Sequence, residues 1–253
     1  MNKPITIIAN WKSNKSVSEV EAWLVEFEEL LTTRKFSAET ELVLAPAYPA
    51  LAVVGQWLAS ARVFGQERAL TVKLAAQDLS PYPAGSYTGA VSARNLKGLG
   101  VEYVLVGHSE RRHYFGESNQ VAANKIDQAL AAGMVPILCL DDPDFEAQAL
   151  VMSAEGRSRV WVAYEALAAI GTGQSTRPKV VVKAREQLEQ HYDLPKFIYG
   201  GSVTAENVAD YLEMSDGLLV GGASLKPPQL VRPCPPHASP LPAPTFSRMG
   251  RRS

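Results

Sequence analysis

A short apolar run meets a charged cluster at Tyr103-Val104-Leu105-Val106-Gly107-His108-Ser109-Glu110-Arg111-Arg112. The apolar part, residues 103–106, is typical of a buried parallel strand. Barrel enzymes form their active sites at the carboxyl ends of such strands, so His108 is a candidate for chemistry. The alternative is a solvated helix start after a strand, and the cluster alone does not separate the two interpretations.

Eight short apolar segments of this kind recur along the chain, and amphipathic segments lie between them. This alternation predicts β–α–β units around a parallel sheet. We expect strands near residues 5–9, 41–45, 72–76, 103–106, 135–140, 159–164, 196–200 and 216–221. Eight strands suit a closed (β/α)8 barrel, and about 250 residues commonly form one such domain.

The first amphipathic segment has a clear beginning. Ser16 followed by Glu19 forms a capping-box pattern, and apolar side chains then recur at helical spacing as far as Leu31. Further helices are expected over 121–132, 180–192 and 205–214. Before the sixth strand there is room for one short helix, around 145–154.

Two other strand ends carry residue types that are useful in catalysis. The first strand leads into Asn10-Trp11-Lys12, and the sixth ends at Glu165, ahead of Ala169-Ile170-Gly171-Thr172-Gly173. Glycine-rich segments follow the last two strands, at Tyr199-Gly200-Gly201-Ser202-Val203 and Leu219-Val220-Gly221-Gly222-Ala223-Ser224-Leu225. In this order the five motifs resemble the triosephosphate isomerase family over about residues 4–225, and the resemblance implies a TIM barrel.

The resemblance also implies a reaction, the interconversion of dihydroxyacetone phosphate and D-glyceraldehyde 3-phosphate. A proton moves between adjacent carbons through an enediolate, which demands a base, a polarising acid and a cation. By position in the family pattern, Glu165 is the base, His108 the neutral electrophile and Lys12 the cation. Asn10 is expected to hold Lys12 and the substrate hydroxyl, with Glu110 as the ion-pair partner of Lys12.

Phosphate recognition needs backbone N–H groups and little side chain. Gly171, Ser202, Gly221 and Gly222 offer such groups after the sixth, seventh and eighth strands, the usual phosphate site of these barrels. No nucleotide-binding or metal-ligand motif occurs in the sequence. The expected substrate is therefore a small triose phosphate, and the expected chemistry needs no cofactor and no metal.

The composition argues against several other classes of protein. The chain has 253 residues, 46% of them hydrophobic, and a formal net charge of -1, so it lacks the basic excess of a nucleic-acid-binding protein. No apolar stretch reaches a membrane-spanning length. Cys139 and Cys234 form neither a disulfide framework nor a zinc pattern. These features predict a cytoplasmic protein that binds neither nucleic acid nor membranes.

The sequence departs from the family pattern around the lid that closes over the substrate. The family has proline directly after the catalytic glutamate and tryptophan two residues further on, whereas this chain has Ala166-Leu167-Ala168. Asp141-Asp142 also stand where the family's fifth loop usually has Gly-Glu. Because proline restrains a loop, we expect closure with poorer positioning of the Glu165 carboxylate.

The end of the chain departs further, because prolines crowd residues 226–253. Proline removes a backbone donor and cannot sit inside a helix, so the eighth helix is expected to be missing or replaced by a proline-rich tail, with at most a turn at 229–231. We predict one barrel domain over 1–225 and an irregular tail over 226–253. The side chains then expected to lose cover are Ile5, Ile7, Leu218 and Val220. An irregular or frame-altered end is favoured over a proline-rich ligand for a partner domain.

The loop from Gln77 to Gly89 bears on assembly. In the family this loop docks beside the lysine of a neighbouring subunit and completes the site, so the resemblance implies a homodimer. Ala90 follows the loop where the family often has a glutamate that pairs with an arginine across the interface. The strength of the interface is therefore left open.

Three functions stay open at this point. The first is an active isomerase, the second a barrel that binds phosphosugar and turns it over poorly, and the third a non-enzymatic interaction protein that uses its tail. The combination of Lys12, His108 and Glu165 favours the first two. An isomerase assay of the purified protein, with Glu165→Ala as the control, separates the three.

Overall fold

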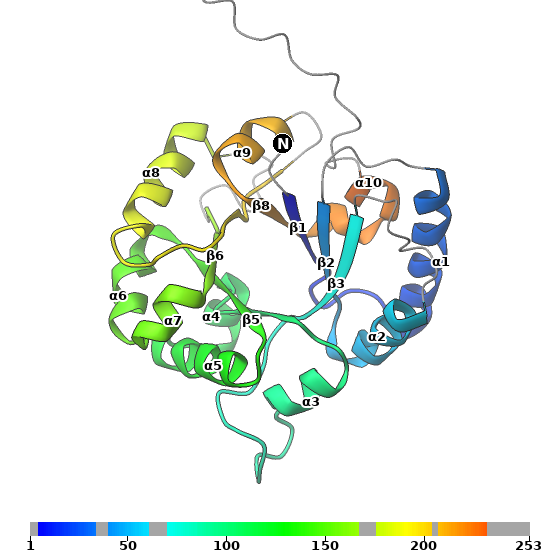
Figure 1. Ribbon diagram of the computed structural model, residues 1–253, viewed down its shortest axis with the longest axis horizontal. Helices are drawn as coiled ribbons and strands as arrows, with labels where there is room; N and C mark the ends of the chain where they lie inside the picture. The colour runs from blue at the N-terminus through cyan, green and yellow to red at the C-terminus, as the bar shows by residue number, and fades with distance from the viewer. Residues whose placement is uncertain (1–4, 34–39, 61–69, 167–175, 204–206, 232–253) are drawn as a thin grey trace, which may run out of the picture.

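The computed structural model describes residues 5–33, 40–60, 70–166, 176–203 and 207–231. Within these residues eight parallel strands close into a barrel, with β1 paired to both β2 and β8 (Figure 1). The strands are β1 (Ile5–Asn10), β2 (Thr40–Ala45), β3 (Leu70–Ala76), β4 (Tyr103–Val106), β5 (Val135–Leu140), β6 (Trp161–Tyr164), β7 (Phe197–Tyr199) and β8 (Gly217–Val220). The predicted (β/α)8 TIM barrel is confirmed, and each predicted strand overlaps an observed one.

Helices surround the barrel and cover the outer face of its strands (Figure 1). The longer ones are α1 (Val17–Thr33), α2 (Leu51–Ser60), α5 (Asn119–Ala131) and α8 (Pro178–Leu188). The shorter ones are α3 (Ala93–Gly98), α4 (Ser109–Phe115), α6 (Phe145–Leu150), α7 (Ala154–Arg159), α9 (Val208–Met214) and α10 (Pro227–Val231). The predicted capping box is present, since Glu19 N–H donates to Ser16 Oγ (3.4 Å) and Ser16 N–H to Glu19 Oε2 (2.7 Å).

The segment before β6 differs from the prediction. Instead of one helix around 145–154 it forms two, α6 and α7, and α7 continues to Arg159, where a strand was expected to begin. The reason is a second helix start, because Ser153 caps α7 by accepting a hydrogen bond from Gly156 N–H (3.0 Å). The strand therefore begins at Trp161.

The chain end also differs. The expectation of at most a turn at 229–231 is wrong, because α10 spans Pro227–Val231. Prolines are tolerated in the first turn of a helix, where their missing N–H groups have no intrahelical partner to lose. Leu230 and Val231 are buried, and α10 packs against α1. Residues 232–253 lie outside the described part of the chain.

The expected loss of cover on the strands does not occur. Ile7 and Leu218 are fully buried, Val220 is buried, and Ile5 is partly buried against the core. The side chains of β1 and β8 are therefore better covered than the proline content of the chain end suggested.

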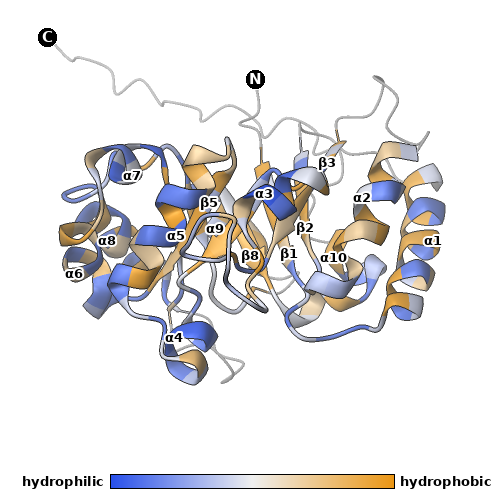
Figure 2. Cartoon of the chain, turned by 90° about the horizontal axis from the view of Figure 1, so that it is seen from below, coloured by the Kyte–Doolittle hydropathy of each residue, from blue (hydrophilic) through white to orange (hydrophobic). Residues whose placement is uncertain are grey.

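The barrel interior is a packed core, and the strands are its most apolar elements (Figure 2). Each strand contributes at least one residue to an inner cluster that contains Ile8, Val43, Ala75, Leu105, Ile137, Ala163, Ile198 and Leu219. Cys139 belongs to the same cluster and is fully buried. Side chains alternate along a strand, so the residues two positions beyond Ile8, Ala75 and Ala163 face the same way. Those residues are Asn10, Gln77 and Glu165.

The strands all point the same way, so their carboxyl ends form one rim, and α4 lies at that rim (Figure 2). No helix among the described residues is long and apolar enough to cross a membrane. The cytoplasmic location stays a prediction.

Candidate active site

The rim holds a cavity of about 280 Å³ that collects the residues predicted from three different strand ends. Asn10 and Lys12 enter it from β1, His108 from β4 and Glu165 from β6. The remaining lining residues are Gly200, Gly201, Ser202, Leu219, Gly221 and Gly222. Of the predicted site residues, Gly171 lies outside the described part of the chain, and Glu110 lines the neighbouring cavity.

His108 is held in one tautomer by the helix that follows it. It is the N-cap of α4, and its Nδ1 accepts a hydrogen bond from Glu110 N–H (3.2 Å). In the neutral ring the proton then resides on Nε2, which lies 3.1 Å from Glu165 Oε1. Because α4 begins at Ser109, the N-terminal end of the helix, with its partial positive charge, lies beside the ring.

Glu165 is buried, with 2% of its surface exposed. Ser109 donates from its backbone N–H to Oε2 (2.8 Å) and from its hydroxyl to Oε1 (3.2 Å). Burial nevertheless raises the pKa of the Glu165 carboxyl above its ordinary value, because His108, the hydrogen bonds from Ser109 and the charge of Lys12 together offset only part of the lost hydration. This is the shift that a general base working near neutral pH needs.

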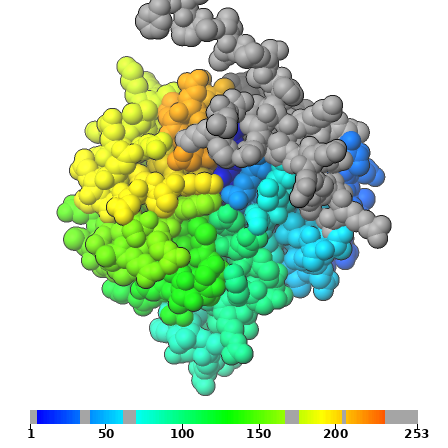
Figure 3. All heavy atoms as spheres, in the orientation of Figure 1, coloured from blue at the N-terminus to red at the C-terminus, as the bar shows by residue number. Residues whose placement is uncertain are grey.

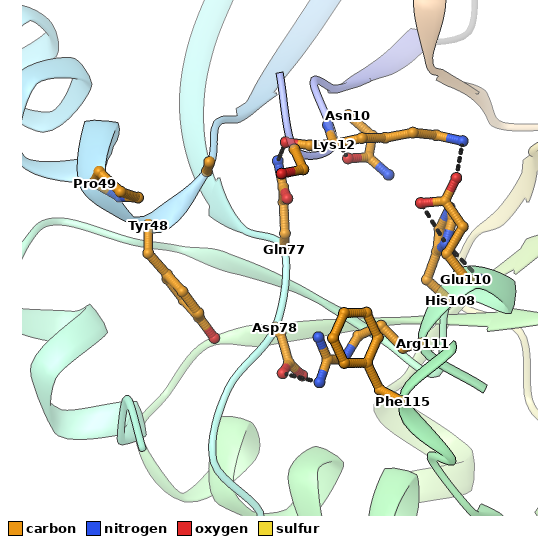
Figure 4. Close-up of a pocket in the computed structure, with 12 residues that line it drawn as sticks. Asn10, Lys12, Tyr48, Pro49, Gln77, Asp78, His108, Glu110, Arg111 and Phe115 are labelled. Carbon is orange, nitrogen blue, oxygen red and sulfur yellow. Dashed lines mark hydrogen bonds and ion pairs between the residues drawn. The ribbon is translucent and has the colours of Figure 1, made fainter. Parts of the chain in front are cut away.

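Lys12 occupies an unusual backbone conformation at the end of β1. Its φ is 51°, in the left-handed region, and its N–H donates to Asn10 Oδ1 (3.0 Å). The Nζ atom lies 2.5 Å from Glu110 Oε1, so the predicted ion pair is confirmed. Asn10 therefore holds the lysine backbone, and Glu110 holds its ammonium group at the mouth of the cavity (Figure 4).

The strand end that carries Glu165 is fixed from both sides. Glu165 N–H donates to Leu140 O (2.8 Å), and Gly200 N–H donates to Tyr164 O (2.8 Å). Asp142, one of the two residues that depart from the family pattern in the fifth loop, contacts this strand end, since Tyr164 Oη donates to Asp142 Oδ2 (2.8 Å). Ala166 is buried, whereas Leu167 and Ala168 lie outside the described residues.

Below His108 lies a group of four charged residues, the charge quartet of Asp78, Arg111, Glu117 and Lys125. Lys125 Nζ is 2.6 Å from Asp78 Oδ1 and 2.5 Å from Glu117 Oε2, and Arg111 contacts the same two carboxylates at 2.8 Å each. Glu117 Oε1 also accepts from the N–H of Gly107, the residue directly before His108 (3.0 Å). Arg111 therefore joins the start of the 77–89 loop, through Asp78, to Glu117 just after α4.

The two carboxylates of the quartet respond differently to burial. Burial raises the pKa of Asp78, and the two cations do not fully offset it. Burial acts in the same direction on Glu117, but there the hydrogen bonds and charges of Lys125 and Arg111 outweigh it, so the pKa of Glu117 lies below its ordinary value. The four formal charges cancel, which keeps the buried group tolerable.

Sequence reasoning missed Ser109 and Gln77 as functional residues. Ser109 contacts a residue 56 positions away, and Gln77 one 65 positions away. A serine after a histidine at a strand end, or a glutamine after a strand, carries no local pattern that identifies its partner.

Fold and site together define a (β/α)8-barrel enzyme of the acid–base type, with its chemistry at the carboxyl ends of the strands. The model of the triosephosphate isomerase family matches residues 5–234, which is most of the chain. The chain belongs to the triosephosphate isomerase family.

Individual relatives agree with this assignment. Triosephosphate isomerase of Thermus thermophilus is 36% identical over 249 residues, which cover 88% of this chain and 94% of the relative. The enzyme of the same name from Paracidovorax citrulli is 39% identical, with 89% and 95% covered, and that of Alkaliphilus metalliredigens 34% identical, with 89% and 96% covered. The family resemblance found in the sequence is confirmed.

Proposed function

We propose that Lys12, His108 and Glu165 carry the isomerisation of triose phosphates in this chain, the activity that family membership assigns to it. Glu165 removes a proton from the substrate carbon beside the carbonyl and returns it to the neighbouring carbon. The Nε2–H of His108 polarises the carbonyl and exchanges a proton with the enediolate oxygens. The ammonium of Lys12 stabilises the negative charge of the enediolate and of the phosphate.

One observation carries this proposal. His108 Nε2 and Glu165 Oε1 lie 3.1 Å apart in a cavity that Lys12 also lines, although the three residues come from different strands. A base, a neutral donor and a cation thus face the same small volume. In the structure Glu165 is bound to Ser109, so the carboxylate has to exchange those hydrogen bonds for a position over the substrate carbon.

The phosphate is proposed to bind at the glycine-rich rim of β7 and β8. Ser202, Gly221 and Gly222 line the cavity on this side, and a short 3-10 turn, Gly222–Leu225, follows. A methyl group added at Gly222 would meet no atom within 4 Å, so the space beside its backbone is open to an anion. Gly171 is proposed to join them from beyond the described residues.

The test is a coupled isomerase assay of the purified protein with dihydroxyacetone phosphate, run with and without EDTA. We expect turnover in both conditions at the same rate, because none of the proposed steps uses a metal. Loss of activity on chelation would show that the metal-free proposal is wrong. Absence of turnover from a folded protein would favour the phosphosugar-binding alternative, for which the Ala166-Leu167-Ala168 hinge is the motivating departure.

We further propose that the active form is a homodimer. The 77–89 loop between β3 and α3 projects from the barrel, at the bottom of Figures 1 and 3. Near its tip Tyr82 and Tyr87 stack with ring centroids 4.7 Å apart, and their exposed fractions are 50% and 43%. Beside Lys12 lies a second cavity of about 290 Å³, whose lining includes Tyr48 and Phe115 (Figure 4). An aromatic projection and an aromatic-lined cavity on one chain suit a symmetric exchange between two copies.

The missing glutamate at Ala90 does not leave an arginine without a partner. Arg111, which lines one cavity together with Ala90, pairs with Asp78 of its own chain, so a cross-subunit ion pair is not needed to satisfy it. The interface is therefore proposed to depend on apolar burial more than on charge.

Replacing both Tyr82 and Tyr87 with aspartate is expected to produce monomers, and to lower kcat/KM because the cavity beside Lys12 then lacks its partner loop. Sedimentation equilibrium measures the first effect and the coupled assay the second. Leu150→Asp serves as the control, since Leu150 is 76% exposed on α6, away from this loop (Figure 1). A wild-type protein that is monomeric and fully active would contradict the proposal.

A further inference from the structure

The side chain of Gln77 joins the ends of three consecutive strands. Gln77 follows β3 and faces inward, and its Nε2 donates one hydrogen bond to Ala45 O at the end of β2 (2.8 Å) and another to Lys12 O beyond β1 (2.9 Å). Both amide hydrogens are thus used on main-chain carbonyls. Figure 4 shows the side chain reaching from β3 to the backbone of Lys12.

The two carbonyls differ in how far they depend on Gln77 for a hydrogen-bond donor. Ala45 O also accepts from Trp11 N–H (3.1 Å), so it keeps a partner without Gln77. For Lys12 O, Gln77 is the donor found among the described residues. The carbonyl of Lys12 is therefore the one that depends on Gln77 for its hydrogen bond.

Lys12 needs such support more than an ordinary strand-end residue. A side-chain-bearing residue in the left-handed region is strained, and Lys12 has φ 51°. Its N–H is held by the amide oxygen of Asn10 and its C=O by the amide nitrogen of Gln77. Two amide side chains therefore fix the backbone from which the Lys12 ammonium is aimed.

We propose that Gln77 is a positioning residue for the isomerase reaction, which acts by holding the Lys12 backbone in the conformation that aims its ammonium group at the substrate. The proposal rests on the role proposed for Lys12. It also explains the residue type, because glutamine supplies two neutral N–H donors at the required reach. Glutamate of the same shape would turn carboxylate oxygens toward the two carbonyls, methionine supplies no donor, and asparagine is one methylene too short to bond both.

Gln77→Met tests the proposal. A released Lys12 would bind the phosphate and the enediolate less well, so we expect kcat/KM to fall about tenfold to a hundredfold, by analogy with the cost of a misplacement of about 1 Å. KM for dihydroxyacetone phosphate and the inhibition constant for inorganic phosphate should both rise. Gln77→Asn, which keeps the amide donors but is too short to bond both carbonyls, should show a smaller change in the same direction and serves if the methionine variant does not fold.

The matched control is Tyr192→Phe, which also removes a donor from a main-chain carbonyl, that of Phe145 (3.1 Å), in the core outside the barrel. It should lower the melting temperature without changing KM or the phosphate inhibition constant. Sedimentation of each variant at assay concentration keeps changes of assembly separate from changes in Lys12.

A double-mutant cycle decides whether Gln77 acts through Lys12. In the Lys12→Ala background, Gln77→Met should change kcat/KM by less than about twofold, because the group it positions is gone. The proposal is overturned if the two losses multiply in full, or if Gln77→Met behaves like Tyr192→Phe. In either case a large loss for Lys12→Ala alone would leave the proposed function standing, whereas wild-type activity in Lys12→Ala would overturn both.

Discussion

Shortening Glu165 to aspartate is expected to lower kcat by about a hundredfold to ten-thousandfold while the barrel stays folded. This is the range that a positioned general base contributes. The backbone of Glu165 is fixed by Leu140 O, and that of Tyr164 by Gly200 N–H, so the strand end cannot advance to make up for the lost methylene. Kcat from the coupled assay and the melting temperature measure the two halves of the expectation.

Glu165→Gln is a sharper test than Glu165→Asp, because it keeps the shape of the side chain and removes its ability to act as a base. It should be at least as inactive as Glu165→Asp. A glutamine variant with kcat/KM near that of the wild type would rule out Glu165 as the base.

The acid side of the pH profile follows from the burial of Glu165. A raised carboxyl pKa means that the protonated, inactive form persists to higher pH, so kcat/KM should fall below a pKa that lies above the ordinary glutamate value. The same shift costs stability once pH exceeds the unfolded pKa, since the folded state then has to lose a proton it holds more tightly. Glu165→Gln should therefore unfold no more easily than the wild type at pH 7.

Replacing Lys125 with methionine is expected to cost about 3–5 kcal/mol of unfolding free energy, the usual result of removing one partner from a buried ionic group. Lys125 is 3% exposed and contacts both Asp78 and Glu117. Without it, two buried carboxylates share Arg111 alone. Because net stability is typically about 5–15 kcal/mol, urea denaturation should detect the loss without difficulty.

The pH dependence of this variant has a definite sign. The pKa of Glu117 is lowered in the folded wild type, so its contribution to stability is present above the unfolded pKa and is lost as pH falls through the folded one. Lys125→Met removes part of that contribution, and the difference from the wild type should shrink between pH 7 and pH 4. Lys73→Met is the control, since the Lys73–Glu102 pair is partly exposed and worth at most about 1 kcal/mol. Equal losses for the two variants would contradict the argument.

The strands and the meeting of the candidate catalytic residues at one rim could be predicted because their signals are local. Each strand is a short apolar run that a turn or helix start interrupts, and Lys12, His108 and Glu165 stand directly at strand ends. Once the strands were assigned to a closed barrel, their carboxyl ends had to meet. The sequence alone therefore brought together residues more than 150 positions apart.

Two kinds of feature could not be predicted. Some depend on competition between opposing local tendencies, and others depend on contacts between residues far apart in the sequence. The proline content of the chain end argued against a helix, yet Pro227 and Pro228 fall in the one turn that tolerates them. The bonds of Gln77 to Lys12 and of Ser109 to Glu165 join side chains and backbone across the rim. Their partners depend on the twist and register of the finished barrel, which no single stretch of sequence carries.

Because Cys139 is buried, its thiol can report how fast the barrel opens. Its thiol belongs to the inner cluster and has no exposed surface, and burial raises its pKa well above the ordinary value. A thiol-labelling reagent can reach it only when the strands around β5 separate, so the labelling rate reports that separation in native buffer. In a Cys234→Ser background Cys139 is the sole thiol of the chain. The slow opening of the barrel, which ordinary melting curves do not resolve, then becomes measurable from the labelling of one sulfur atom.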